Sequence, residues 1–262
     1  MLLGCGTLVH TTSHRTASVF VCALLLAPAA AYAAEPSLEG RAVLGADTFA
    51  EGPPSGAAAE PANGRTPPFA SQPVQGFSAV LDGGGGSFWA MPDNGYGSKA
   101  NSTDFLLRMY RIRPAFETAS GGSGGVSVEE YVQLRDPDRR VPFPIQREAG
   151  ERWLTGADFD IEFVRRAANG DLWFGDEFGP FLLHADSTGK LLEAPIELPG
   201  VKSPDSPLLG PGGPANLPRS GGLEGMGLST AGPCRTDVAG EVLHPMLERA
   251  LVGDADSRRR FI

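Results

Sequence analysis

The chain has 262 residues, and its 31 acidic residues outnumber its 22 Lys and Arg residues, which gives a net charge of −9 at pH 7. An acidic surface argues against nucleic acid or an anionic membrane as the partner, and it suits cation binding. Cys5 and Cys22 lie near the N-terminus, far from Cys234. No C-x-x-C zinc pattern occurs, so the cysteines give no sign of a structural metal.

Residues 1–33 have the pattern of a secretory signal peptide. His14 and Arg15 precede an apolar run of roughly 12 residues, ASVFVCALLLAP, and Ala31-Tyr32-Ala33 gives a small-x-small cleavage site. The run is shorter than the roughly 20 residues that a membrane span needs, and no second candidate follows. We expect export, with a short N-terminal anchor as the alternative. Cleavage would remove Cys5 and Cys22, so no internal disulfide is expected.

Residues 34–72 form a Pro-, Ala- and Gly-rich lead-in, which we expect to be extended with one strand from Arg41 to Phe49. Residues 73–262 then show short strand-like runs in groups of four, each group roughly 70 residues after the last. The first two groups cover 77–81, 87–91, 105–113 and 126–134, then 158–165, 171–176, 181–185 and 190–198. A third begins with 222–228 and 242–247. No helical period is evident. The sequence predicts an all-β, propeller-like array of four-stranded antiparallel blades that is incomplete in this chain.

The second group contains the strongest local signal, a hairpin centred on Asn169-Gly170. This residue pair between two alternating apolar runs favours a two-residue turn in which both residues take positive φ. We therefore expect the two strands on either side of it to pair closely.

Acidic residues recur at equivalent places in the three groups. The second run ends at Asp93, at Asp176-Glu177 and at Glu248, and the first run carries Asp158, Asp160 and Glu162, or Glu224. Equivalent positions of successive blades face one axis, so we expect these carboxylates to converge. Oxygen ligands at variable spacing suit Ca²⁺, with Asp93, Asp176, Glu177, Glu224 and Glu248 as its ligands. The alternative is that these acids cap turns and tie blades together.

Alternation places Asp158, Asp160 and Glu162 on one face of a strand, opposite Phe159, Ile161 and Phe163. We interpret the three acids as catalytic, with one of them as a general base. Arg108, Arg111 and Arg219 are candidates for binding a phosphate, as are Lys99 and Arg152, although solvation of the surface would also explain them.

Other motifs carry little weight. Gly121 to Gly125 fits G-x-S-x-G, but it joins two β runs without a following helix, so it is no nucleophile elbow. His184 is read as structural, His244 receives no role, and Cys234 has no activating partner nearby.

Three blocks of the chain resemble a known family: GFSAVLDGGGGSFWAMPDNGYGSKANSTDFLLRMYRIRP, LTGADFDIEFVRR with GDLWFGDEFGPFLLHADSTGKLLEAPI, and GGLEGMGLS with HPMLERALVGDADSRRRFI. They look like the phytase-like family, whose members are called esterase-like activity of phytase proteins. The resemblance covers roughly residues 40 to 262 and implies a secreted propeller with a phosphoesterase or phosphodiesterase role. Members of the family continue into further blades, and the stretch 229–248 replaces a short turn, so we expect a truncated chain with an insertion.

The sequence thus predicts a secreted, monomeric phytase-like protein that hydrolyses a small phosphorylated substrate with the help of Ca²⁺. A non-catalytic binding propeller is the first alternative, and a carboxylesterase is the second.

Overall fold

The computed structural model describes residues 37–210, 212–230 and 240–255. The expected signal peptide, the three cysteines and the last seven residues lie outside this part of the chain. The described residues contain strands, turns and bridges but no helix, in agreement with the all-β prediction. None of them therefore forms a helix with the length and apolarity that crossing a membrane requires.

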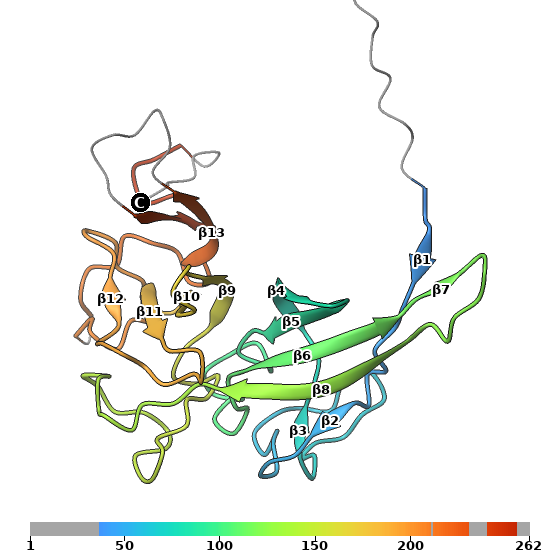
Figure 1. The fold of residues 1–262 in the computed structure, drawn as a ribbon. Coiled ribbons are helices and arrows are strands. Elements are labelled where there is room, and N and C mark those ends of the chain that lie inside the picture. Colours follow the sequence, from blue (N-terminus) through green and yellow to red (C-terminus); the bar gives the residue numbers. More distant parts are fainter. Residues whose placement is uncertain (1–36, 211, 231–239, 256–262) are drawn as a thin grey trace, which may run out of the picture. The chain divides into compact units, whose positions relative to one another are not determined.

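Two four-stranded antiparallel sheets form the bulk of the fold (Figure 1). The first has the order β4-β5-β6-β8 and the second has the order β12-β11-β10-β9. Their strands are β4 (Phe77–Gly84), β5 (Ser87–Pro92), β6 (Arg108–Ala115), β8 (Gly125–Gln133), β9 (Ile161–Arg166), β10 (Leu172–Asp176), β11 (Phe181–Ala185) and β12 (Ile196–Glu197). Both groups of four predicted strands are therefore present, each as one sheet.

Three two-stranded sheets complete the described structure. They pair β13 (Leu223–Thr230) with β14 (Glu241–Leu247), β2 (Phe49–Ala50) with β3 (Gln72–Pro73), and β1 (Gly40–Arg41) with β7 (Glu117–Thr118). The expected strand from Arg41 to Phe49 is wrong, because Arg41 pairs with β7, Val43 forms a single bridge with Gly125 and Phe49 pairs with β3, so the segment is not one continuous strand. The described residues do not form a closed propeller.

The first strand of each larger unit lies against the first strand of the next. β9 contacts both β4 and β13, so β4, β9 and β13 are neighbours although about 85 and 60 residues separate them along the chain. This arrangement brings together the ends of three sheets. It is the feature of the fold that builds the site described below.

The hairpin between β9 and β10 forms as predicted, but its turn differs. Gly170 has φ 94°, whereas Asn169 does not have positive φ. The Gly170 N–H donates to Ala167 O, and the Ala167 N–H donates to Asp171 O, both at 2.9 Å. These bonds describe a type I turn followed by a left-handed glycine, so the expected two-residue turn is wrong.

Apolar residues pack in two clusters. The larger one joins the two four-stranded sheets and contains the fully buried rings of Phe159, Phe174 and Phe181. The smaller one joins the second sheet to β13 and β14 through Phe163, Leu223 and Leu247. Alternation within β9 explains this packing, since Ile161 and Phe163 are buried while Glu162 between them is half-buried.

Candidate functional site

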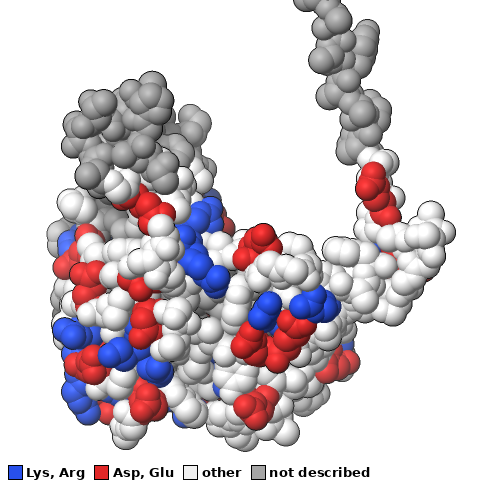
Figure 2. Space-filling model, viewed as in Figure 1, with Lys and Arg blue, Asp and Glu red and all other residues white. Residues whose placement is uncertain are grey.

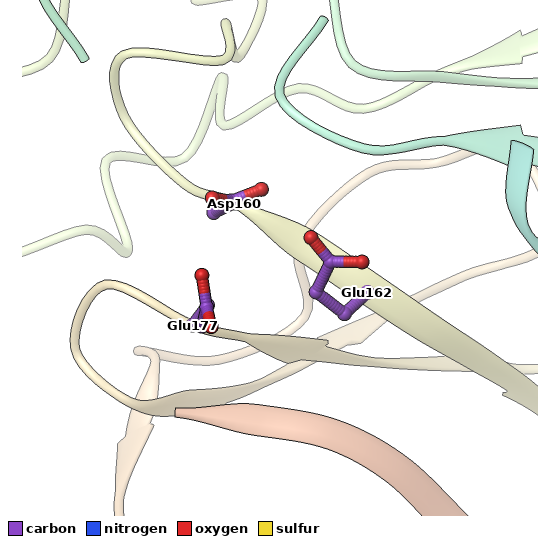
Figure 3. Close-up of side chains that lie close together, drawn as sticks. All are labelled: Asp160, Glu162 and Glu177. Carbon is purple, nitrogen blue, oxygen red and sulfur yellow. The ribbon is translucent and has the colours of Figure 1, made fainter. Parts of the chain in front are cut away.

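Five carboxylates from two strand groups form the acidic cluster: Asp160, Glu162, Glu177, Glu224 and Glu248. Oxygen atoms of Asp160, Glu162 and Glu177 lie within 4.8 Å of one another, and so do oxygen atoms of Glu177, Glu224 and Glu248. Figure 3 shows the first three, with Asp160 just before β9, Glu162 on it, and Glu177 just after β10. Glu177 belongs to both groups and therefore links them.

The β9–β10 hairpin fixes Asp160 and Glu177 through the backbone. The ladder between these strands shifts register between Gly175 and Asp176, which opens the end of the hairpin. The Glu177 N–H then donates to Asp160 O at 2.8 Å. The Asp160 N–H donates to Asp176 Oδ1 at 2.8 Å, and the Gly179 N–H donates to Asp176 Oδ2 at 2.6 Å. Asp176 thereby holds the loop that carries both ligand-type carboxylates.

The first sheet contributes Asp93 and Asn94, which directly follow β5. Asn94 Nδ2 donates to Asp160 Oδ2 at 2.8 Å, so one oxygen of Asp160 is oriented by a neighbouring sheet. The approach is close, because a Cβ on Gly156 would lie 1.9 Å from Asn94 O. Asp93 Oδ1 accepts the Gly95 N–H at 2.7 Å, and the charge of Asp93 acts on Asp160. Asp93 therefore lies at the edge of the acidic cluster.

β13 and β14 bring Glu224 and Glu248 to the other side of Glu177. The Glu248 N–H donates to Gly222 O at 2.8 Å. Gly222 itself packs on the backbone of Glu177, where an added Cβ would lie 2.2 Å from Glu177 O. A glycine is required at this point for β13 to approach the end of β10.

Burial and mutual repulsion raise the pKa of most of these acids. Burial raises the pKa of Asp176 to about 7, and burial with the charges of Asp160, Glu248 and Glu224 raises that of Glu177 to about 8. Burial, followed by the charge of Asp160, also raises the pKa of Glu162. The pKa of Asp160 is raised chiefly by burial. The cluster is therefore short of positive charge in its own structure.

The shortage of positive charge is greatest at one oxygen atom of Asp160. Asp160 Oδ1 is buried and receives no hydrogen bond from an N–H or hydroxyl group, and only the neighbouring Glu162 carboxyl, when protonated, can donate to Asp160; Oδ2 is held by Asn94. A buried carboxylate oxygen without a donor is costly, and a cation would satisfy it. Flexible, oxygen-only coordination is what Ca²⁺ accepts, so Asp160, Glu162 and Glu177 fit such an ion.

Asp158, predicted to share a strand face with Asp160 and Glu162, instead lies in a turn before β9. Its carboxylate accepts the Thr155 N–H and hydroxyl at 2.8 and 2.9 Å, and the Gln146 N–H at 2.8 Å. The turn forms because these donors lie three residues back and in the preceding loop. Asp158 therefore does not share a strand face with Asp160 and Glu162.

The three predicted phosphate-binding arginines do not gather at the acidic cluster. Arg108 is buried against Tyr131, 3.9 Å from the ring centroid, and donates to Gln133 Oε1 and Glu51 O, each at 2.8 Å. Arg111 pairs with Glu130 across the first sheet at 3.0 Å. Arg219 pairs with Asp205. Local partners use these cations, and acidic and basic side chains are interspersed on the face drawn in Figure 2.

Lys99, one of the candidate phosphate-binding cations, lies close to the buried acids. Its Nζ donates to Asp205 O at 2.8 Å and lies 4.5 Å from the centre of the Phe178 ring. Its charge acts on Asp176 and Asp158, and burial lowers the pKa of its ammonium group. The sequence marks it only as one of five candidate cations, because its place depends on the contact between the loop after β5 and the loop after β10.

The comparison with family models matches residues 72–262 to the phytase-like family, described as esterase-like activity of phytase. Comparison with curated proteins gives no match, and comparison with solved structures gives none either. The family model covers well over half of the sequence, including every residue of the acidic cluster. The chain therefore belongs to the phytase-like family.

Proposed function

We propose that this protein is a secreted hydrolase of phosphate esters that works with a bound Ca²⁺ ion on a propeller-type scaffold. The observation that carries the proposal is the buried, unpartnered Asp160 Oδ1 within a group of carboxylates whose oxygens lie within 4.8 Å of one another. Membership of the phytase-like family supports phosphate-ester hydrolysis as the reaction class. The adjacent first strands β4, β9 and β13 support the propeller arrangement.

In this proposal Asp160 and Glu177 hold the ion, with Glu224 and Glu248 completing the site on the other side of Glu177, and Glu162 stays free for the proton transfer described below. A bound Ca²⁺ would neutralise the carboxylates and withdraw electron density from a phosphate oxygen. Asn94 keeps Asp160 in one orientation, and Asp176 fixes the Asp160 backbone. These two residues act by positioning, because their polar atoms are already used within the protein.

The reaction is the attack of water on phosphorus, with cleavage of the ester P–O bond and protonation of the released alcohol. A carboxylate at the edge of the group accepts the proton that water loses. Glu162 is suited to this role because it is half-buried and projects from a regular strand beside Asp160. Lys99, whose charge acts on the buried Asp176, supplies positive charge toward the phosphate.

Phosphate release from a panel of monoesters and diesters, measured with Ca²⁺ and with a chelator, tests the proposal. We expect hydrolysis that the chelator abolishes and that Glu162→Gln lowers by roughly 10²-fold or more, the usual contribution of a general base. Glu130→Gln, on the exposed face of β8, is the matched control and keeps full activity. Ca²⁺ binding without hydrolysis of any ester would instead identify a non-catalytic binding protein.

One observation favours a second function, carboxylester hydrolysis. Ser229 Oγ on β13 lies 2.8 Å from His244 Nε2 on β14, and both side chains are partly buried. A serine hydrogen-bonded to a histidine is the starting arrangement of an activated nucleophile. A fluorophosphonate probe that labels the protein but not its Ser229→Ala variant would support this function. Absence of labelling would leave the pair as a cross-strand contact.

A further inference from the structure

We propose that residues 46–75 and Tyr96 form a binding pocket for an uncharged aromatic ring, the alcohol part of the phosphate ester. This inference rests on the proposed function and names the substrate class. The cavity measures about 370 Å³, within the usual range of small-molecule sites. We call it the cap pocket. The family match begins at residue 72, so most of the residues that line the pocket lie in a part of the chain that the family model does not cover.

Backbone hydrogen bonds order the segments that form the walls of the cap pocket. β2 and β3 pair at its base, and Ser55 and Phe69 exchange two backbone hydrogen bonds at 3.1 and 2.8 Å. Ala62 and Arg65 exchange two more across an Asn63-Gly64 turn whose φ values are 51° and 74°. Three sets of backbone hydrogen bonds thus fix the conformation of the loop that surrounds the cavity.

Side chains anchor this loop to the segment that precedes β6. The Asp104 carboxylate accepts the Gly56 and Ala57 N–H groups at 2.7 and 2.8 Å. The buried Gln72 side chain donates to Pro53 O at 2.8 Å and accepts the Leu106 N–H at 2.8 Å. A pocket held by such bonds is formed before a ligand arrives, which lowers the entropic cost of binding.

The lining determines the ligand chemistry. Phe49 and Phe69 lie with ring centroids 5.4 Å apart, and Pro67 and Pro73 add apolar walls. Phe49 leaves 39 % of its surface exposed, so part of its ring is accessible to a ligand. The charged residues of the lining are Glu60 and Arg65, one of each sign, and Arg65 is paired with Asp47. An uncharged, flat apolar group fits this lining better than an ion.

Two chain segments connect the cap pocket to the acidic cluster. Gln75 lines the pocket, and the next residue, Gly76, lies so that an added Cβ would be 3.8 Å from Asp93 Oδ1. Tyr96 lines it from the loop that begins with Asp93 and Asn94, and its hydroxyl donates to Ser55 Oγ at 3.1 Å. The loop after β5 thus carries both a residue of the pocket, Tyr96, and the residues at the edge of the acidic cluster, Asp93 and Asn94, and in this proposal the phosphate of the ester lies on the side of that edge.

The first test measures binding without any phosphate. We expect 1-naphthol to bind the full chain in calorimetric titration, and Phe49→Ala to weaken binding roughly three- to tenfold, the range of one aromatic contact. Ala59→Trp fills the pocket and should abolish binding. The exposed neighbour Ala58, which does not line the pocket, provides the matched control Ala58→Trp. Equal binding by Ala59→Trp and Ala58→Trp, at unchanged unfolding temperatures, overturns the pocket, as does absence of naphthol binding to the parent chain.

The second test measures specificity. We expect Ala59→Trp to lower kcat/KM for 1-naphthyl phosphate at least tenfold while leaving that for methyl phosphate unchanged. An equal loss for both esters overturns the role of the pocket in specificity. Naphthol binding without hydrolysis of either ester overturns the proposed function but keeps the cap pocket as a ring-binding site, so the two failures are distinguishable.

Discussion

Replacement of Asp160 by Asn is expected to stabilise the cation-free protein, because it removes one of the crowded charges of the acidic cluster. The amide keeps an oxygen for Asn94 but removes one of the charges whose oxygens lie within 4.8 Å of each other. Two full charges at that separation repel by roughly 3 kcal/mol at an effective dielectric constant of about 20, an upper bound because Glu177 is partly protonated. In chelator at pH 8 we therefore expect Asp160→Asn to unfold a few degrees above the parent protein.

Calcium should invert this order. At 100 times its Kd an ion stabilises a folded protein by about 2.7 kcal/mol, which for a domain of this size is roughly 5–11 °C. A hundredfold loss of affinity leaves about 0.4 kcal/mol, or about 1 °C. Differential scanning calorimetry with Ca²⁺ and with chelator measures both shifts. An unchanged calcium shift in Asp160→Asn, with the same shift in the Glu130→Gln control, would refute the assignment of Asp160 as a ligand.

Three further outcomes follow from the structure. The pKa values of Asp176 and Glu177 are raised to about 7 and about 8, so both groups favour the folded state only while they are protonated. The stability of the chelated protein is therefore greatest below pH 4 to 5 and falls as the pH rises through the raised pKa values of about 7 and about 8. A melting temperature in chelator that does not fall between pH 5 and 9 contradicts this expectation. Arg152→Ala should cost about 3–5 kcal/mol in urea unfolding, because Arg152 and Asp136 form a pair at 3.2 Å with 3 % and 0 % exposed side chains; a loss below about 1 kcal/mol would be the behaviour of a surface pair. Gly222→Ala should remove the calcium shift by displacing Glu177, whereas Gly225→Ala, whose Cβ would meet no atom closer than 3.6 Å, should retain it in the same calorimetric measurement.

The strand content could be predicted from the sequence because alternation and turn residues are local. Ile161, Phe163, Phe174 and Phe181 are buried as their alternation indicates. The turn at Asn169-Gly170 could not, since both a two-residue and a three-residue hairpin accept that pair. The two-residue geometry is instead found at Asn63-Gly64, where both residues have positive φ. The lead-in is predicted to be extended because it is rich in Pro, Ala and Gly, yet the Asp104 side chain, from outside the lead-in, and the Gln72 side chain, at its end, order it through hydrogen bonds.

The acidic residues of the candidate site could be predicted from the sequence, but the role of each carboxylate could not. Equivalent positions of successive strand groups indicated that Asp160, Glu177, Glu224 and Glu248 would meet, and the structure brings them together. Whether a carboxylate faces a cation or caps a backbone depends on donors far away in the chain. Asp158 meets the Gln146 N–H, a contact no local pattern reveals. The same holds for the arginines, which pair with acidic or carbonyl groups that their own sequence neighbourhood does not contain.

The acidic cluster is difficult to explain as a stabilising device. Acids that cap turns, such as Asp158 and Asp176, have both oxygens occupied by N–H or hydroxyl donors. Asp160 differs, because one oxygen is held by Asn94 while the other is buried without a donor beside two further carboxylates. Replacing it with an uncharged residue would relieve repulsion, so its presence lowers the stability of the cation-free protein. A group that is costly to the fold and rigidly oriented by a neighbouring sheet is best explained by the ion it would bind, since binding converts the same crowding into affinity.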